Sequence, residues 1–176
     1  MIIALAANTH RPSKTRALLD ELVGQFRQQS DLPVEAFDLM DLGRDIGGSY
    51  SKQELSAQSL ALVEAIEQAD GLILTSPVYK GSYSGLFKHL FDLVDPLSLR
   101  NTPVLLSATG GGQRHALMVE HQMRPLFGFF SAATVPTSVY GCDAEFVDGR
   151  CADSILLHRC AQAVDEFARV CGRGGA

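Results

Sequence analysis

Residues 1–19, "MIIALAANTHRPSKTRALL", decide the fold, because they join a buried strand, a polar loop and the start of a helix. The run 1–7 is apolar without alternation, which is typical of a strand covered on both faces in a parallel sheet. From Thr15 to about Gln29, apolar residues recur at helical spacing. A strand that passes through a loop into a helix is also where α/β proteins bind phosphate groups.

The remainder of the chain repeats this alternation. Further strands are predicted at 33–39, 71–77, 103–112 and 133–139. Helices are predicted at 54–68, 84–94, 115–130 and 153–171, with a polar loop at 43–53 and a bend or break at Pro125. The pattern predicts one α/β domain over 1–172, with a five-stranded parallel sheet covered by helices on both faces, and a loose tail at 173–176.

The composition fits this class and excludes others. The chain has 176 residues, 46% hydrophobic and 20% charged, and these are globular values. Its net charge of −5 argues against a general nucleic-acid or membrane binder. The N-terminal segment lacks the basic residues of a signal peptide and the length of an anchor, so a cytoplasmic location is expected.

The four cysteines all lie in the last fifth of the chain, at Cys142, Cys151, Cys160 and Cys171. No pair has the CxxC spacing of a zinc or redox site, so ordinary packing and surface thiols are expected, and no metal site.

Three loops follow strands whose carboxyl ends share one edge of the sheet, where ligands bind in open α/β folds. The first, 8–14, lacks both GxGxxG and the Walker A pattern, which argues against a dinucleotide or ATP site. Its amide and hydroxyl groups, from Asn8, Thr9, Ser13 and Thr15, precede a helix start and suit a terminal phosphate. Alternatively, Ser13 only caps the helix.

The second and third loops, 77–84 and 109–115, are rich in glycine. "SPVYKGSYSG" combines two tyrosines with Gly81, and "TGGGQRH" contains three consecutive glycines. Both suit close approach of main chain to a flat ligand, although a capped turn and a flexible surface turn would explain them as well.

These segments resemble the NAD(P)H-dependent FMN reductase family, and most narrowly the flavin reductases of two-component alkanesulfonate and methanesulfonate monooxygenase systems. The resemblance rests on "LAANTHRPSKTRALL", "ADGLILTSPVYKGSYSGLFKHLFDLV" and "ATGGGQRHALMV". It implies a flavodoxin-like sheet of order 2-1-3-4-5. It also implies FMN-binding residues, namely Asn8, His10, Ser13, Lys14 and Thr15 for the phosphate, and Pro77, Val78, Tyr79, Lys80, Gly81, Thr109, Gly110, Gly111 and Gly112 for the ring.

The first loop departs from the family pattern, which begins Gly-Ser-x-Arg. Ala7, Asn8 and His10 stand at the three defined positions. The bidentate grip of the arginine is lost unless Arg11 takes its place. The departure indicates either weaker retention of the phosphate or a different geometry.

The fourth helix is one residue longer than in typical quinone- and azo-reducing relatives, and His121 occupies the extra position. In the two-component reductases this residue makes a π-bulge, a feature frequent at functional sites. The alternative is an ordinary surface histidine.

The resemblance implies hydride transfer from NADPH or NADH to flavin N5, with reduced FMN passed to a partner monooxygenase. It suggests organosulfur metabolism as the setting. No catalytic acid or base is expected, because the cofactors carry the chemistry. The family also forms dimers or tetramers through the region of helix 84–94. Two alternatives remain, namely an FMN-bound quinone, azo-dye or chromate reductase and a flavodoxin-type electron carrier. A CheY-like regulator is set aside, because it would need an acidic cluster at the strand ends.

Overall fold

The computed structural model describes residues 1–42 and 44–173. Its main sheet has the order β2-β1-β3-β4-β5, and these neighbouring strands pair in parallel. The strands are β1 (Ile2–Ala6), β2 (Val34–Asp38), β3 (Gly71–Pro77), β4 (Pro103–Gly110), β5 (Ala133–Thr134) and β6 (Val139–Cys142), with a separate hairpin of β7 (Phe146–Val147) and β8 (Arg150–Cys151). This order and the parallel pairing confirm the predicted sheet.

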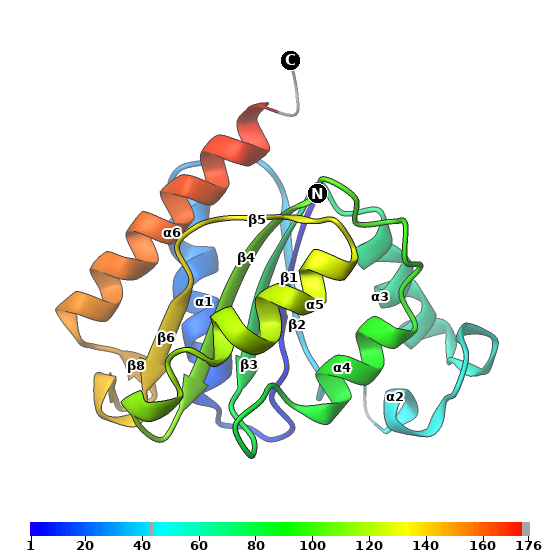
Figure 1. The fold of residues 1–176 in the computed structure, drawn as a ribbon, viewed down its shortest axis with the longest axis horizontal. Coiled ribbons are helices and arrows are strands. Elements are labelled where there is room, and N and C mark those ends of the chain that lie inside the picture. The colour runs from blue at the N-terminus through cyan, green and yellow to red at the C-terminus, as the bar shows by residue number, and fades with distance from the viewer. Residues whose placement is uncertain (43, 174–176) are drawn as a thin grey trace.

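Helices cover both faces of the sheet (Figure 1). They are α1 (Lys14–Arg27), α2 (Asp45–Gly48), α3 (Ala57–Glu67), α4 (Gly85–Asp92), α5 (Arg124–Phe129) and α6 (Ser154–Arg173). Alternate residues of β1 explain the two layers, because Ile2 and Ala4 pack in one core cluster with α1 and α6, whereas Ile3 and Leu5 pack in the other with α3, α4 and α5. All five residues of β1 are buried, as the unbroken apolar run predicts.

The fifth strand differs from its prediction. The segment predicted as one strand, 133–139, forms β5 opposite the start of β4 and contributes only its last residue to β6, which lies opposite the end of β4. Pro136 lies between the two short strands, and proline cannot donate to a sheet ladder. The fifth position of the sheet is therefore shared by two strands.

Two other segments differ from the regular loop and helix that the residue pattern predicts. Within the predicted loop 43–53, α2 and a 3-10 turn at Lys52–Glu54 form, and Gly43 lies outside the described residues. The predicted helix 115–130 begins as a 3-10 turn, continues as a π-helix over Val119–Met123 and ends as α5. The π-helix includes His121, the position at which the resemblance implies a π-bulge. Residues 174–176 of the predicted tail also lie outside the described part. Among the helices described here, none has the length and apolar character required to cross a bilayer.

Candidate functional site

Hydrogen bonds join the three predicted loops at the carboxyl edge of the sheet. The hydroxyls of Thr15 and Thr109 lie 2.7 Å apart and are buried, so they connect the start of α1 to the end of β4. The backbone N–H of Val78 donates to the carbonyl of Thr109 at 2.7 Å. Ser84 completes the connection, because its hydroxyl donates to the carbonyl of Ala7 at 3.3 Å. The loops thus form one surface.

The first loop presents neutral donors at the start of α1. Ser13 is the N-cap, since its hydroxyl accepts from the N–H of Arg16 at 3.4 Å. The N–H groups of Lys14 and Thr15 make no hydrogen bond to the described chain, and the helix dipole adds positive potential there. Within the Thr15–Thr109 pair one hydroxyl hydrogen is used between the two oxygens, which leaves the other for an external acceptor.

Asn8 lies fully buried beneath this loop. Its side-chain N–H donates to the carbonyl of His10 at 3.0 Å, whereas its side-chain oxygen has no hydrogen-bond partner among the described residues. A buried polar atom without a partner is unusual in a folded protein, and ligand sites are one place where it occurs. The His10 side chain is exposed.

Arg11 does not take the place of the missing family arginine. Its guanidinium donates two hydrogen bonds to Asp38, at 2.8 and 2.7 Å, and a third to Asp41 at 2.6 Å. Asp38 ends β2 and its carboxylate is completely buried. Burial alone would raise the pKa of Asp38, but the hydrogen bonds from Arg11 and Asn8 lower it below its usual value. Arg11 is thus the counter-ion of a buried carboxylate.

Lys14 is also engaged, because its ammonium group lies 2.9 Å from the carboxylate of Asp143. Both side chains are substantially exposed, so this ion pair is weak and a ligand can compete for the lysine. The start of α1 therefore presents backbone N–H groups and hydroxyls, with Lys14 as an adjustable charge beside them.

The second loop is a tight turn after β3. Tyr79 and Ser82 exchange two backbone hydrogen bonds, and the two residues between them, Lys80 and Gly81, both have positive φ, at 52° and 83°. This turn type requires left-handed backbone, which explains Gly81. The turn leaves Tyr79 41% exposed beside the first loop, with its hydroxyl 3.5 Å from that of Thr9.

The third loop is held from the neighbouring strand by Tyr140, a residue that sequence reasoning missed. The Tyr140 hydroxyl donates to the carbonyl of Gly112 at 2.7 Å. A Cβ atom at Gly111 or Gly112 would meet nothing within 4 Å, so both glycines border open space. The main chain here can accept a flat ligand at close range.

The π-helix after this loop contains His121, whose side chain is exposed. Next to it, Glu120 accepts two hydrogen bonds from Arg124, at 2.5 and 2.9 Å, and one from Ser138 at 2.7 Å. The hydrogen bonds from Arg124 lower the pKa of Glu120 to about 2. The ion pair joins the π-helix to α5, and the Ser138 hydroxyl and the Val135 carbonyl connect the pair to the segment between β5 and β6, while the His121 side chain stays exposed to contact another molecule.

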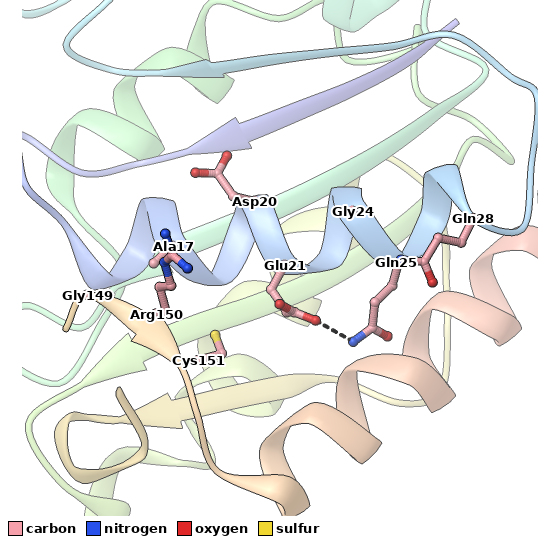
Figure 2. Close-up of a pocket in the computed structure, with 9 residues that line it drawn as sticks. All are labelled: Ala17, Asp20, Glu21, Gly24, Gln25, Gln28, Gly149, Arg150 and Cys151. Carbon is pink, nitrogen blue, oxygen red and sulfur yellow. Dashed lines mark hydrogen bonds between the residues drawn. The ribbon is translucent and has the colours of Figure 1, made fainter. Parts of the chain in front are cut away.

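A cavity adjoins the first loop. It has a volume of about 760 Å³ and lies between the first loop, the end of β2 and α4, where its lining includes Thr9, Met40 and Leu86. A second cavity, of about 490 Å³, lies between α1 and the β7–β8 hairpin (Figure 2). None of the predicted site residues lines the second cavity, so it is not part of the loop surface.

Cys151 lines that second cavity, and its buried environment makes its thiol unreactive. Burial and the nearby charge of Glu21 raise the pKa of Cys151 to about 12, and burial likewise raises that of Cys160 to about 12. Such thiols stay protonated at neutral pH and are poor nucleophiles. The four cysteines are free, and within residues 1–42 and 44–173 no cluster of His, Cys, Asp and Glu side chains has a metal-binding arrangement.

Comparison with solved structures gives the fold class of this chain. Among solved structures, an oxidoreductase from Corynebacterium diphtheriae matches with a TM-score of 0.85 and 28% identity, covering 98% of this chain and 96% of that one. Oxidised flavodoxin 1 from Bacillus cereus matches with a TM-score of 0.66 at 16% identity, covering 96% and 97%, and shares the fold alone. The class is therefore that of flavodoxin-like α/β proteins.

Sequence comparison gives the family. Residues 1–146 match the model of the family described as NADPH-dependent FMN reductase. The NADH-dependent FMN reductase SfnF of Pseudomonas fluorescens is 46% identical over 173 residues, which cover 97% of this chain and 91% of the relative. FMN reductase (NADPH) of Pseudomonas aeruginosa is 41% identical over 171 residues, covering 97% and 92%. The chain belongs to the NADPH-dependent FMN reductase family, which confirms the expected enzyme class and its reactants, FMN and a nicotinamide nucleotide.

The described residues fit FMN in kind. The helix start offers neutral donors to a phosphate, the open glycines of the third loop offer main chain to a ring, and the buried oxygen of Asn8 lacks a partner. The sequence pattern found the three loops, but it missed Asp38, Tyr140 and Glu120. Each of these acts through a residue distant in sequence or through a neighbouring strand.

Proposed function

We propose that this protein reduces FMN with NADH or NADPH and releases the reduced flavin to a partner monooxygenase, with FMN a dissociating substrate. One observation carries the proposal, namely that the only arginine of the first loop is committed to Asp38 and Asp41. A phosphate held by backbone N–H groups, hydroxyls and one exposed lysine lacks the bidentate guanidinium contact that gives strong retention.

The residues of this chain bind and orient the reactants. The flavin, when bound, accepts a hydride from the nicotinamide, and this chemistry belongs to the two cofactors. The first loop would hold the phosphate through Ser13, Lys14 and Thr15. Main chain of Val78–Gly81 and Thr109–Gly112 would support the ring and exclude water from one side of it. Neither loop supplies a proton donor or base to the transfer, so the contribution of the protein is proximity and alignment.

The assembly follows the family resemblance. A groove of about 500 Å³ between α4 and α5 is lined by Phe91, Leu126, Phe129 and Phe130, and the Phe129 side chain is 69% exposed. An exposed aromatic side chain beside an apolar groove is typical of protein interfaces. Homodimers or homotetramers formed through this surface would place the loops of neighbouring subunits near one another. A cytoplasmic location and an organosulfur setting belong to the same proposal.

The deciding experiment follows nicotinamide oxidation with and without added FMN, on protein passed through gel filtration. Colourless protein that oxidises NADH or NADPH only when FMN is added supports the proposal. Protein that remains yellow and reduces quinones or azo dyes without added FMN supports the alternative of an FMN-bound reductase. The FMN-dependent NADPH-azoreductase of Staphylococcus haemolyticus, 30% identical over 138 residues, shows why this alternative needs a test.

A further inference from the structure

Tyr140 lies on β6, outside every segment on which the resemblance rests. Its ring is partly buried, and its hydroxyl donates to the carbonyl of Gly112 across 28 residues of sequence. Burial raises the pKa of Tyr140, so the hydroxyl keeps its proton at neutral pH and remains a donor. The contact is short, at 2.7 Å, and joins β6 to the triple-glycine segment, whose residues have the greatest intrinsic backbone freedom.

The same tyrosine explains why residue 110 is glycine. A Cβ atom at Gly110 would lie 2.4 Å from the Tyr140 hydroxyl oxygen and 3.3 Å from its Cζ. Gly110 does not have a left-handed φ, so glycine is required for space and not for backbone conformation. Tyr140 therefore packs on the Cα of Gly110 while it bonds to Gly112, and it contacts both ends of the triple glycine.

The other side of the loop is already fixed. Thr109 accepts from the N–H of Val78 through its carbonyl and pairs with Thr15 through its hydroxyl. Gly110 is held by pairing with Cys142 in the ladder of β4 and β6. Beyond it, the Tyr140 hydroxyl makes the shorter of two contacts to the carbonyl of Gly112, the other being the N–H of His115 at 3.5 Å. Without the Tyr140 contact, binding of a ligand against these glycines would have to order them, at an entropic cost of about 1 kcal/mol or more per residue.

We propose that Tyr140 is a positioning residue for the flavin ring, which it serves by holding Gly110–Gly112 in the conformation that faces the ring. The inference rests on the proposed function, because it takes the ligand of this loop to be a flavin. Tyr140 acts through the main chain, so it touches neither FMN nor the nicotinamide. Its loss should weaken ring binding and leave both the phosphate contact and the hydride transfer within the bound complex largely intact.

The first test is Tyr140→Phe, which removes the hydroxyl and keeps the ring. Binding of FMN and of riboflavin is measured by quenching of flavin fluorescence, with no nicotinamide present. Both affinities should fall by about fivefold to tenfold, the worth of one lost hydrogen bond, while KM for FMN rises and kcat changes little. Tyr50→Phe is the control, because Tyr50 is 89% exposed and far from the loops in sequence, and it should bind flavin like the wild type.

The second test is a double-mutant cycle with Gly110→Ala. In the wild-type background the new Cβ meets the Tyr140 hydroxyl, and flavin affinity should fall by tenfold or more, about the effect expected for an overpacked site. In the Tyr140→Phe background the nearest atoms are 3.3 and 3.4 Å away, and adding Gly110→Ala should change affinity by no more than about twofold. Thermal unfolding of all four proteins identifies any variant that is only misfolded.

The outcomes separate this inference from the proposed function. Equal flavin binding by the wild type and Tyr140→Phe, or an equal effect of Gly110→Ala in both backgrounds, overturns the role of Tyr140 and leaves the proposed function intact. Loss of FMN binding with unchanged riboflavin binding also overturns it, because that pattern belongs to a phosphate contact. A wild-type protein that binds no flavin overturns both.

Discussion

The first and third loops meet at the same edge of the sheet, yet they are held by different forces. The first loop depends on charge, since Arg11 is paired with Asp38 and Asp41, and Lys14 with Asp143. The third loop depends on neutral hydrogen bonds, between the hydroxyls of Thr109 and Thr15 and from Tyr140 to main chain. One loop is thus sensitive to acid and salt, and the other is not.

This difference shows how a basic loop can bind an anion weakly. Arg11 and Lys14 place positive charge in the sequence of the first loop, but carboxylates of this chain neutralise much of it before a ligand arrives. If Arg11 moved to a phosphate, the buried Asp38 carboxylate would lose its closest counter-ion, at a cost in free energy that keeps Arg11 in place. In the proposed function the phosphate is left to neutral donors and Lys14, which fits a flavin that binds and leaves in each cycle.

The largest expected effect is on stability, in Arg11→Met. The variant keeps the length of the side chain and leaves the buried Asp38 carboxylate with Arg16 as its counter-ion, at 3.8 Å. We expect the urea midpoint of unfolding to fall several times more than in the control below, but by less than for a fully buried pair because Arg11 is half exposed. Urea unfolding measures this, and Arg169→Met, which breaks the exposed pair with Asp165, is the control, with an expected loss of about 0.5 kcal/mol or less.

The pH dependence of the difference in stability between the wild type and Arg11→Met identifies Asp38 as the partner of Arg11. Arg11 and Asn8 lower the pKa of Asp38 in the folded state, so the stabilisation is complete above the unfolded value of about 3.9 and is lost as pH falls through the folded value. The wild type and Arg11→Met should therefore converge in stability only in acid below about pH 4. A difference that persists unchanged at lower pH would exclude Asp38 as its source. The ratio of FMN to riboflavin affinity should be similar in both proteins, because Arg11 does not hold the phosphate.

The next effect is a gain of affinity, in His10→Arg. This change restores the arginine that the family pattern has at this position, and the exposed side chain leaves room for it. A charge-assisted bidentate contact should tighten FMN binding by about tenfold or more and leave riboflavin binding unchanged. His10→Lys, which adds a point charge without the bidentate geometry, should give a smaller gain. Unchanged FMN affinity in His10→Arg would mean that the phosphate lies elsewhere.

The smallest effect concerns the neutral link between the two loops. Thr15→Val leaves the buried Thr109 hydroxyl without a partner and should destabilise the fold by about 1–2 kcal/mol. The double variant Thr15→Val with Thr109→Val removes both hydroxyls and should lose less than the sum of the single changes. Thermal unfolding gives this comparison. Strict additivity would show that the hydroxyls do not pair in solution.

The parts of this fold that local pattern determines could be predicted from the sequence. β3 spans Gly71–Pro77, the predicted segment, because an apolar run ends at a proline. The split of the fifth strand was missed, since the segment 133–139 reads as a continuous strand although Pro136 interrupts its ladder. The α2 helix, only four residues long, was missed because its sequence, "DIGG", has low helical propensity.

The candidate site divides in the same way. Loops that follow buried strands can be located once the strands are predicted, and their polar residues can be identified directly from the sequence. The residues that set the properties of the loops lie elsewhere, as Asp38 does at the end of β2 and Tyr140 on β6. Their contacts depend on how the strands align across the sheet, which local pattern does not give. A lone aspartate ending an apolar strand, with an unassigned arginine in the adjacent loop, was the one available signal.

The central claim, that FMN dissociates because no arginine holds its phosphate, is tested most directly by titrating flavin-free wild-type protein with FMN. Flavin fluorescence or calorimetry gives the dissociation constant after gel filtration has removed any carried flavin. The account predicts colourless protein and a Kd in the micromolar range, about −8 kcal/mol of binding free energy. Protein that elutes yellow with one FMN per chain and a Kd of about 1 nM or below would contradict it.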